Sequence, residues 1–272
     1  NQTVATVETD KARVDMPSPV AGTLRAQGGQ PGDVIPVGSV LFIGATAFAL
    51  TNGFGLPADS PVVKAAESVG IVRSADVEAS SAEGSDEAQV EAAVAKCVEH
   101  YGKLDVMVNN AQASKSGTNL IDHTKEDFDL AINTGLYGAF FYMKHAFPEL
   151  KKTKGCVINL ASGAGLFGKP GQSSYAAAKE GIRGMTRVAA TEWGPDGVRA
   201  NCICPLAMTE QLAAWKEAYP DTFAATIKGI PLGRFGDPKT DIGGVAVFLA
   251  SDLSAYVSGE TITVQGGSGL RP

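Results

Sequence analysis

One stretch of the chain, residues 162–179, carries side chains whose types and spacing could move a proton. Tyr175 and Lys179 stand at positions i and i+4 in SSYAAAKEGIRGMTRVAATEW, a run that is rich in helix formers and has no proline. At this spacing both side chains lie on one helical face, one turn apart. An ammonium group beside a phenol favours the phenolate and lowers the phenol pKa from its usual value of about 10. Such a tyrosine can exchange a proton with an alcohol or carbonyl oxygen near neutral pH.

Ser162 ends the apolar segment CVINLAS, which is predicted to be a buried strand just before that helix. Its hydroxyl could hold the same substrate oxygen. A Tyr-x-x-x-Lys pair also arises in helices that do no chemistry, so the surrounding motifs decide between the two interpretations. NNA lies upstream at 109–111, Asn133 stands between NNA and Ser162, and VRANCICP and SAYVSGETITVQGG follow the helix.

These motifs, in this order, resemble those of the short-chain dehydrogenase/reductase family over about residues 85–272. The resemblance implies an enzyme that transfers a hydride between NAD or NADP and a small-molecule alcohol or ketone. In the catalytic tetrad that it implies, Tyr175 is the general acid/base, and Lys179 lowers the pKa of Tyr175 and holds the nicotinamide ribose. Ser162 orients the substrate oxygen, and Asn133 supports a water that relays protons. The resemblance further implies a cytoplasmic homo-oligomer, either a dimer or a homotetramer.

The family binds the dinucleotide pyrophosphate with T-G-x-x-x-G-x-G between its first strand and first helix, where glycines let backbone amides approach the phosphates. Residues 40–43 are predicted to form that strand. Gly44 could open the loop, and Gly53 and Gly55 supply a G-x-G. More residues separate Gly44 from Gly53 than the family allows, and prolines stand where the helix should run. We therefore expect a degraded or rebuilt loop and weak dinucleotide affinity.

Other cofactor positions also depart from the family pattern. VGIVRSADV is predicted to be the third strand, with Asp76 as the adenine contact. The second strand, whose acidic or basic residue selects NAD or NADP, is not found, so the choice is not readable. Gln112 replaces the glycine after NNA, and Leu206 replaces the glycine after Pro205. The cofactor-binding positions that the resemblance implies are Asn109, Ala111, Tyr175, Lys179, Pro205, Thr209, Gly44, Gly53, Gly55 and Asp76.

The order of the predicted elements indicates the fold class. Ser85 is predicted to cap a helix over DEAQVEAAVAKCVEHYG, followed by a buried strand in KLDVMVNNA, a long helix over 124–144 and a buried strand in GVRANCICP. Residues 211–228 are predicted to be the loop and helices over the substrate, where three aromatic side chains either contact the substrate or pack within the loop. Alternating strands and helices favour an α/β fold, a Rossmann-like doubly wound parallel sheet. Substrate would bind outside the carboxyl ends of its strands.

Residues 1–44 have a different pattern, with short β-rich runs separated by turn residues. ETDKA, followed by PSPVAG and GD-x-x-x-x-G, resembles the second half of a lipoyl carrier domain, in which Lys11 at a hairpin tip would carry the lipoyl group. Half of such a fold has open edges and too little core to stand alone, so we expect an unmodified β-rich extension. The predicted domains are this lipoyl-like segment over 1–44 and a dinucleotide-binding catalytic domain over 45–272, although the strand at 40–43 fits both.

Composition excludes several classes of partner. The chain of 272 residues is 44% hydrophobic and 19% charged, which is typical of a globular protein with a sizeable core. A net charge of −6 with no basic run argues against nucleic acid. The longest apolar stretch, 37–50, is too short to span a bilayer, and no secretion signal opens the sequence. The four cysteines show no C-x-x-C, so we expect buried free thiols and no metal site.

Two alternatives to an active dehydrogenase stay open at this point. One is a catalytically impaired relative, whose tetrad is intact but whose altered cofactor positions, including Gln112 and Leu206, bind dinucleotide poorly. The other is a carrier module acylated at Lys11. Cofactor titration separates the first from an active enzyme, and an intact-mass measurement identifies the second.

Overall fold

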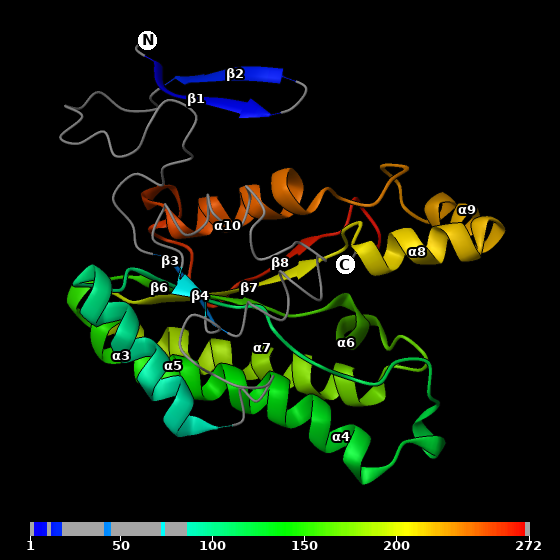
Figure 1. The fold of residues 1–272 in the computed structure, drawn as a ribbon, viewed down its shortest axis with the longest axis horizontal. Helices are drawn as coiled ribbons and strands as arrows, with labels where there is room; N and C mark the ends of the chain where they lie inside the picture. The colour runs from blue at the N-terminus through cyan, green and yellow to red at the C-terminus, as the bar shows by residue number, and fades with distance from the viewer. Residues whose placement is uncertain (1–2, 10–11, 18–40, 45–71, 74–85, 270–272) are drawn as a thin grey trace.

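The structure, a computed structural model, describes residues 3–9, 12–17, 41–44, 72–73 and 86–269 of the chain. Two sheets form within these ranges (Figure 1). In the first, β1 (Thr3–Thr9) pairs antiparallel with β2 (Ala12–Pro17), and Thr9 is opposite Ala12. The two strands that flank the predicted hairpin tip are therefore present, while Lys11 itself lies outside the described residues.

The second sheet has six strands, all parallel, in the order β4-β3-β5-β6-β7-β8. Parallel strands that are covered on both faces have continuous apolar runs instead of alternating ones. The segments VMVN and CVINL follow this rule, and all of their residues are buried. The predicted Rossmann-like, doubly wound parallel sheet is confirmed. Its strands are β3 (Leu41–Gly44), β4 (Val72–Arg73), β5 (Val106–Asn109), β6 (Cys156–Leu160), β7 (Arg199–Pro205) and β8 (Thr261–Val264).

The strand order reverses at β3, which has β4 on one side and β5 on the other. Open parallel sheets bind ligands outside the carboxyl ends of the strands at such a switch point. Gly44 and Asn109, the last residues of β3 and β5, are register partners there. The segment at 41–44 thus lies in the parallel sheet, as expected of a first strand. β4, predicted as the third strand, pairs directly with β3 in the described part of the sheet.

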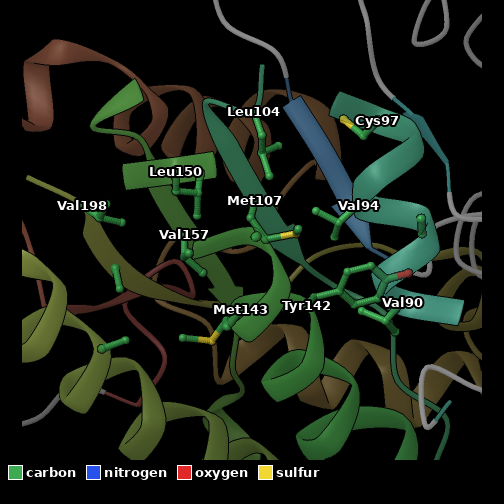
Figure 2. Close-up of a cluster of buried hydrophobic side chains, with 14 residues drawn as sticks. Val90, Val94, Cys97, Leu104, Met107, Tyr142, Met143, Leu150, Val157 and Val198 are labelled. Carbon is green, nitrogen blue, oxygen red and sulfur yellow. The ribbon is translucent and has the colours of Figure 1, made fainter. Parts of the chain in front are cut away.

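Helices cover both faces of this sheet: α3, α5 and α7 lie against one face and α10 against the other (Figure 1). Successive side chains of a strand point to opposite faces. Met107 and Val157 accordingly enter the cluster under α3 and α5, whereas Val108 and Ile158 pack toward α10. Figure 2 shows the first cluster, in which buried side chains from α3, α5 and the neighbouring strands meet. The two buried layers hold the strand ends in fixed positions.

The longer helices are α3 (Glu87–Tyr101), α4 (Lys125–Ala131), α5 (Gly138–Thr153), α7 (Ser173–Trp193), α8 (Glu210–Ala218), α9 (Pro220–Lys228) and α10 (Gly243–Ala250). The shorter ones are η3 (Leu120–Asp122), η4 (Ile132–Tyr137), α6 (Gly163–Phe167), η5 (Gly194–Asp196), η6 (Pro238–Ile242) and η7 (Asp252–Ser254). None of the helices in the described part of the chain is both long and apolar enough to cross a membrane.

Local signals set the helix ends, with one correction. Asp86, and not the predicted Ser85, caps α3, because its carboxylate accepts a hydrogen bond from the Gln89 backbone N at 3.1 Å. Aspartate and serine are equally good N-caps, so the sequence alone could not separate these neighbours. Thr124 caps α4 in a reciprocal capping box with Asp127.

The helix predicted over 124–144 begins where expected but is longer and not uniform. It continues to Thr153, and its middle part, η4, is π-helical. Such segments are rare and occur frequently at functional sites. Asn133, a predicted tetrad residue, lies inside η4.

Candidate active site

Ser162, Tyr175 and Lys179 come from two adjacent elements at the carboxyl end of β6. Ser162 follows β6 in an extended conformation and caps α6, where its Oγ accepts a hydrogen bond from the Ala164 N at 3.1 Å. Tyr175 and Lys179 lie in the first turns of α7, as predicted. The Tyr175 phenol also hydrogen-bonds with the Ser162 side chain. The structure therefore brings the serine and the tyrosine together.

Lys179 is almost completely buried, with 3% of its surface exposed. Its Nζ donates to the Leu160 carbonyl at 2.6 Å and lies 5.6 Å from the centre of the Tyr175 ring. Burial lowers the pKa of Lys179 to about 8, because removing solvent disfavours the ammonium form. The neutral amine and the ammonium form of Lys179 are therefore equally populated close to physiological pH.

The pKa of Tyr175 moves in the direction opposite to the one predicted. Loss of solvation around the phenol raises its pKa, and the hydrogen bond with Ser162 acts the other way with a smaller effect. The ammonium of Lys179 donates to the Leu160 carbonyl and is not among the groups that set this direction. That Lys179 lowers the Tyr175 pKa therefore stays a prediction.

Asn133 lies on a helix that packs against α7, but its side chain is exposed. The packing is close because Gly181 of α7 leaves room for Leu136: a Cβ at Gly181 would be 2.9 Å from Leu136 Cδ2. The Asn133 side chain makes no hydrogen bond to another described residue, whereas its carbonyl accepts one from the Gly138 N with π-helical spacing. The structure thus brings Asn133 to the same helix pair without joining its side chain to Tyr175 or Ser162.

Asn109 begins a buried chain of hydrogen bonds that links neighbouring elements. Its Nδ2 donates to Asn159 Oδ1 at 2.7 Å, and Asn159 Nδ2 donates to Thr186 Oγ1 at 2.8 Å. The chain joins β5, β6 and α7. Its signal in the sequence is a polar residue inside an apolar strand, as in CVINL. Asn109 Oδ1 is buried and has no hydrogen-bond partner among the described residues, which leaves an acceptor at the switch point of the sheet.

Gln112, which stands where the family has glycine, is accommodated by a glycine elsewhere. Its side chain fills the space beside Gly135, where a Cβ would lie 2.5 Å from Gln112 Cδ, and its Nε2 donates to the Ala131 carbonyl at 3.4 Å. Next to it, the Ala113 N donates to Thr134 Oγ1 at 3.0 Å. The loop that follows β5, which contains Ala111 and Gln112, is thereby attached to η4.

The other predicted cofactor residues lie at the end of β7. Pro205 is its last residue, and Thr209 caps α8 by accepting a hydrogen bond from the Leu212 N at 3.3 Å. Leu206, in place of the family glycine, keeps regular backbone pairing, since its N donates to the Val264 carbonyl at 2.9 Å. Gly53, Gly55 and Asp76 lie outside the described residues, and of the predicted glycine loop only Gly44 is described.

The segment predicted over the substrate forms α8 and α9, and two of its three aromatic residues pack internally. Phe223 contacts Trp215 edge to face at 5.8 Å between ring centres and Phe235 at 5.5 Å. Tyr219, between the two helices, is 60% exposed. Packing within the segment therefore accounts for Trp215 and Phe223. The four cysteines are buried and free, as expected.

Comparison with known proteins gives two family matches. A family described as enoyl-(acyl carrier protein) reductase matches residues 59–269, and a family described as biotin-requiring enzyme matches residues 1–43. The second match agrees with the lipoyl-like resemblance of the amino-terminal segment.

Individual relatives agree with the first match. A 12α-hydroxysteroid dehydrogenase of Clostridium sp. is 56% identical over 190 residues, which cover 69% of this chain and 73% of that protein. A 3-oxoacyl-(acyl-carrier-protein) reductase of Thermotoga maritima is 38% identical over 188 residues, covering 67% and 73%. Among solved structures, levodione reductase aligns with a TM-score of 0.70 at 28% identity, covering 84% of this chain and 96% of its own. ElxO with NADP bound aligns with a TM-score of 0.70 at 25% identity, covering 84% and 97%.

Proposed function

The chain belongs to the short-chain dehydrogenase/reductase family, and from this premise we propose that Tyr175 is the general acid/base of its reaction. The chain is an oxidoreductase that transfers a hydride between NAD or NADP and an alcohol or carbonyl group. The observation that supports the role of Tyr175 is its hydrogen bond with Ser162 at the carboxyl end of a central parallel strand, beside the buried Lys179. A substrate oxygen placed between the two hydroxyls would meet a proton donor and an orienting partner together.

The described residues fit a nicotinamide dinucleotide at this edge of the sheet. Asn109 Oδ1 is a buried acceptor that a bound group could satisfy, and Lys179 supplies a buried donor one turn from Tyr175. Asn109, Lys179, Pro205 and Thr209 would hold the nicotinamide half. When bound, the nicotinamide accepts or gives the hydride, and all other steps belong to protein side chains.

In the oxidation direction, Tyr175 takes the hydroxyl proton of the substrate while Ser162 holds the same oxygen. In the reduction direction, Tyr175 returns the proton to the carbonyl oxygen. With a dinucleotide bound, Lys179 would donate a hydrogen bond to the ribose, and Asn133 would support the water that passes the proton onward to solvent. The raised pKa of Tyr175 keeps the phenol protonated in the resting protein, which suits the reduction direction.

Tyr175→Phe tests this assignment. The variant keeps the ring and its packing but has no proton to give, so turnover should fall to near the limit of detection while dinucleotide binding stays close to that of the parent. Tyr256→Phe is the matched control, because Tyr256 is fully exposed. Turnover by the Tyr175→Phe protein that is near the parental rate would remove Tyr175 from the mechanism.

For the substrate, we propose a secondary hydroxyl on a steroid nucleus. The support is the 56% identity to an enzyme named for the oxidation of 12α-hydroxysteroids. The assay follows nicotinamide absorbance with a 12α-hydroxysteroid, with an isomer whose hydroxyl is on another ring carbon, and with a 3-oxoacyl thioester. The 12α-hydroxysteroid should give the highest kcat/KM. A preference for the thioester would overturn the substrate class and leave the role of Tyr175 unaffected.

We further propose a cytoplasmic homo-oligomer, as the family resemblance implied, and size-exclusion chromatography with light scattering checks the assembly. The selection of NAD or NADP is decided by titrating NADH and NADPH in parallel.

Lys11 is a second candidate site, because the biotin-requiring-enzyme match covers it and the flanking strands pair around it. Protein made with lipoate available should be weighed intact: a lipoyl mass on Lys11 establishes a carrier, and an unmodified chain excludes it.

A further inference from the structure

Gln265, directly after β8, is a buried polar side chain that the mechanism above does not use. Only 8% of its surface is exposed, and its Nε2 donates to the Cys204 carbonyl at 3.4 Å. Cys204 lies near the end of β7, which pairs with β8 over the preceding residues. The amide therefore sits at the carboxyl ends of the strands, the same edge of the sheet that carries Ser162.

The Gln265 amide lies directly against Gly163, the residue after Ser162. A Cβ built on Gly163 would be 2.5 Å from Gln265 Nε2, 3.1 Å from Oε1 and 3.2 Å from Cδ. Contacts shorter than van der Waals distance to three atoms of one group mean that the glutamine amide occupies the space that a side chain at 163 would need. Gly163 and Gln265 are thus a complementary pair.

The contact bears on Ser162 because Gly163 is the first residue of α6 and Ser162 is its N-cap. Ser162 has extended backbone angles, φ −153° and ψ 143°, and its Oγ accepts a hydrogen bond from the Ala164 N. The direction of its side chain therefore depends on where the first turn of α6 lies. Gln265 is the side chain against that turn, and it is anchored to β7 through Cys204.

We propose that Gln265 is a positioning residue for Ser162, holding the first turn of α6 through Gly163 so that the serine hydroxyl meets the substrate oxygen. This inference rests on the proposed role of Ser162 beside Tyr175. The contact between Gln265 and Gly163 then has a specific geometric function, because the Gln265 amide at the end of β8 sets the direction of the Ser162 hydroxyl at the end of β6. Gln265 acts through backbone contact and needs no contact with the substrate.

A merely structural role for Gln265 makes different predictions. β8 is held by its own backbone pairing with β7 from Cys202 to Pro205, and the Leu206 N donates to the Val264 carbonyl. Loss of the amide therefore leaves the sheet paired. Tyr175 also titrates under the influence of Ser162, with Lys179 and Cys204 as the other titratable groups nearby. Because the Ser162 hydrogen bond lowers the Tyr175 pKa, a displaced serine should move the pH profile of oxidation to higher pH.

The test uses four variants of the full chain: Gly163→Ala, Gln265→Ala, the double variant, and Gly184→Ala as control. Gly184 lies on α7, and a Cβ there would meet nothing within 4 Å. Gly163→Ala should lower kcat about 10²-fold, as displacements of about 1 Å do at catalytic groups, and Gln265→Ala about tenfold. In the double variant the added methyl group has room, so the loss should match that of Gln265→Ala alone. KM for the dinucleotide should stay unchanged in all of them.

The pH profile of kcat for oxidation is the second measurement. Gln265→Ala and Ser162→Ala should both shift the rising limb to higher pH, whereas Gly184→Ala should not. Two results would overturn the inference. One is that Gly163→Ala lowers kcat by the same factor in the parent and in the Gln265→Ala variant. The other is that Gln265→Ala has the same pH profile as the parent. If Gly163→Ala does not fold by circular dichroism, Gln265→Ala and its pH profile still decide. Parental turnover by Ser162→Ala would instead refute the proposed function, so the two failures are distinguishable.

Discussion

Lys179→Met should raise the free energy of unfolding of this protein and lower its turnover severely. Between the folded-state and unfolded-state pKa values of this lysine, the variant should also lack the pH dependence of stability that Lys179 gives the parent. Lys179 is buried, and its pKa in the folded protein is about 8, against 10.5 in the unfolded chain. Between these values the unfolded chain binds more protons than the folded one, so the stability of the parent protein rises with pH. Methionine has a similar length and no charge, and therefore removes this dependence without emptying the site.

The magnitude follows from the two pKa values. A lysine with these values destabilises the folded state by about 3 kcal/mol at a pH of about 7.5 and by about 1.4 kcal/mol at a pH of about 9.5. Between these two pH values, the free energy of unfolding of the parent should therefore increase by about 2 kcal/mol more than that of Lys179→Met. At neutral pH the stabilisation gained by removing the buried charge is partly offset, because the Leu160 carbonyl loses the hydrogen bond that it accepts at 2.6 Å from Lys179. Such a loss costs about 1–3 kcal/mol for a buried group.

Urea unfolding of both proteins across this pH range, followed by circular dichroism, measures the difference directly. Subtracting the two curves cancels the titrating groups that do not interact with Lys179; the thiols of Cys202 and Cys204, whose pKa values Lys179 lowers, do not cancel. Lys169→Met is the matched control, because this lysine is exposed and should leave the pH slope unchanged. A difference between parent and Lys179→Met that stays constant with pH would show that Lys179 titrates normally in the folded protein, and the account of a buried, easily neutralised lysine would then be wrong.

Two further predictions concern neighbouring features. Asn159→Ala should destabilise the fold by about 1–3 kcal/mol in urea unfolding, since the buried Asn109 amide loses its acceptor, whereas Thr191→Ala on the exposed side of α7 should change stability by less than about 0.5 kcal/mol. Because the predicted spacing of Gly44 and Gly53 departs from the family, dinucleotide affinity should be weak, in the high micromolar range or poorer; tight binding of NADH or NADPH in a fluorescence titration would contradict this expectation.

The elements that could be predicted from the sequence are those with local determinants. The helix with Tyr175 and Lys179 follows from its composition and from i, i+4 spacing. The start of α4 at Thr124 follows from a capping signal within one turn. The parallel sheet follows from apolar runs of strand length such as CVINL. In each case the physical cause lies within a few residues of its effect.

The features that could not be predicted depend on contacts between distant segments. The attachment of η4 to the loop after NNA involves Thr134 with Ala113 and Gly135 with Gln112, and nothing near Asn133 in the sequence indicates it. The direction of the Tyr175 pKa depends on burial, which raises it, while the hydrogen bond with Ser162 acts the other way with a smaller effect. Spacing alone predicts that the two side chains are neighbours, but it does not show that a backbone carbonyl receives the ammonium group.

The site is assembled from strand ends, and this separates the groups that do the chemistry from those predicted to bind the pyrophosphate. Ser162 follows β6, Cys204 and Pro205 end β7, and Gln265 follows β8, so their relative positions are set by register in a continuous parallel ladder. The predicted glycine loop follows β3 in the sequence, and β3 pairs with β4 and β5 and not with β6, β7 or β8. Substitutions in the loop should therefore change dinucleotide affinity and leave the pH profile of Tyr175 intact, whereas substitutions at Gln265 should do the reverse.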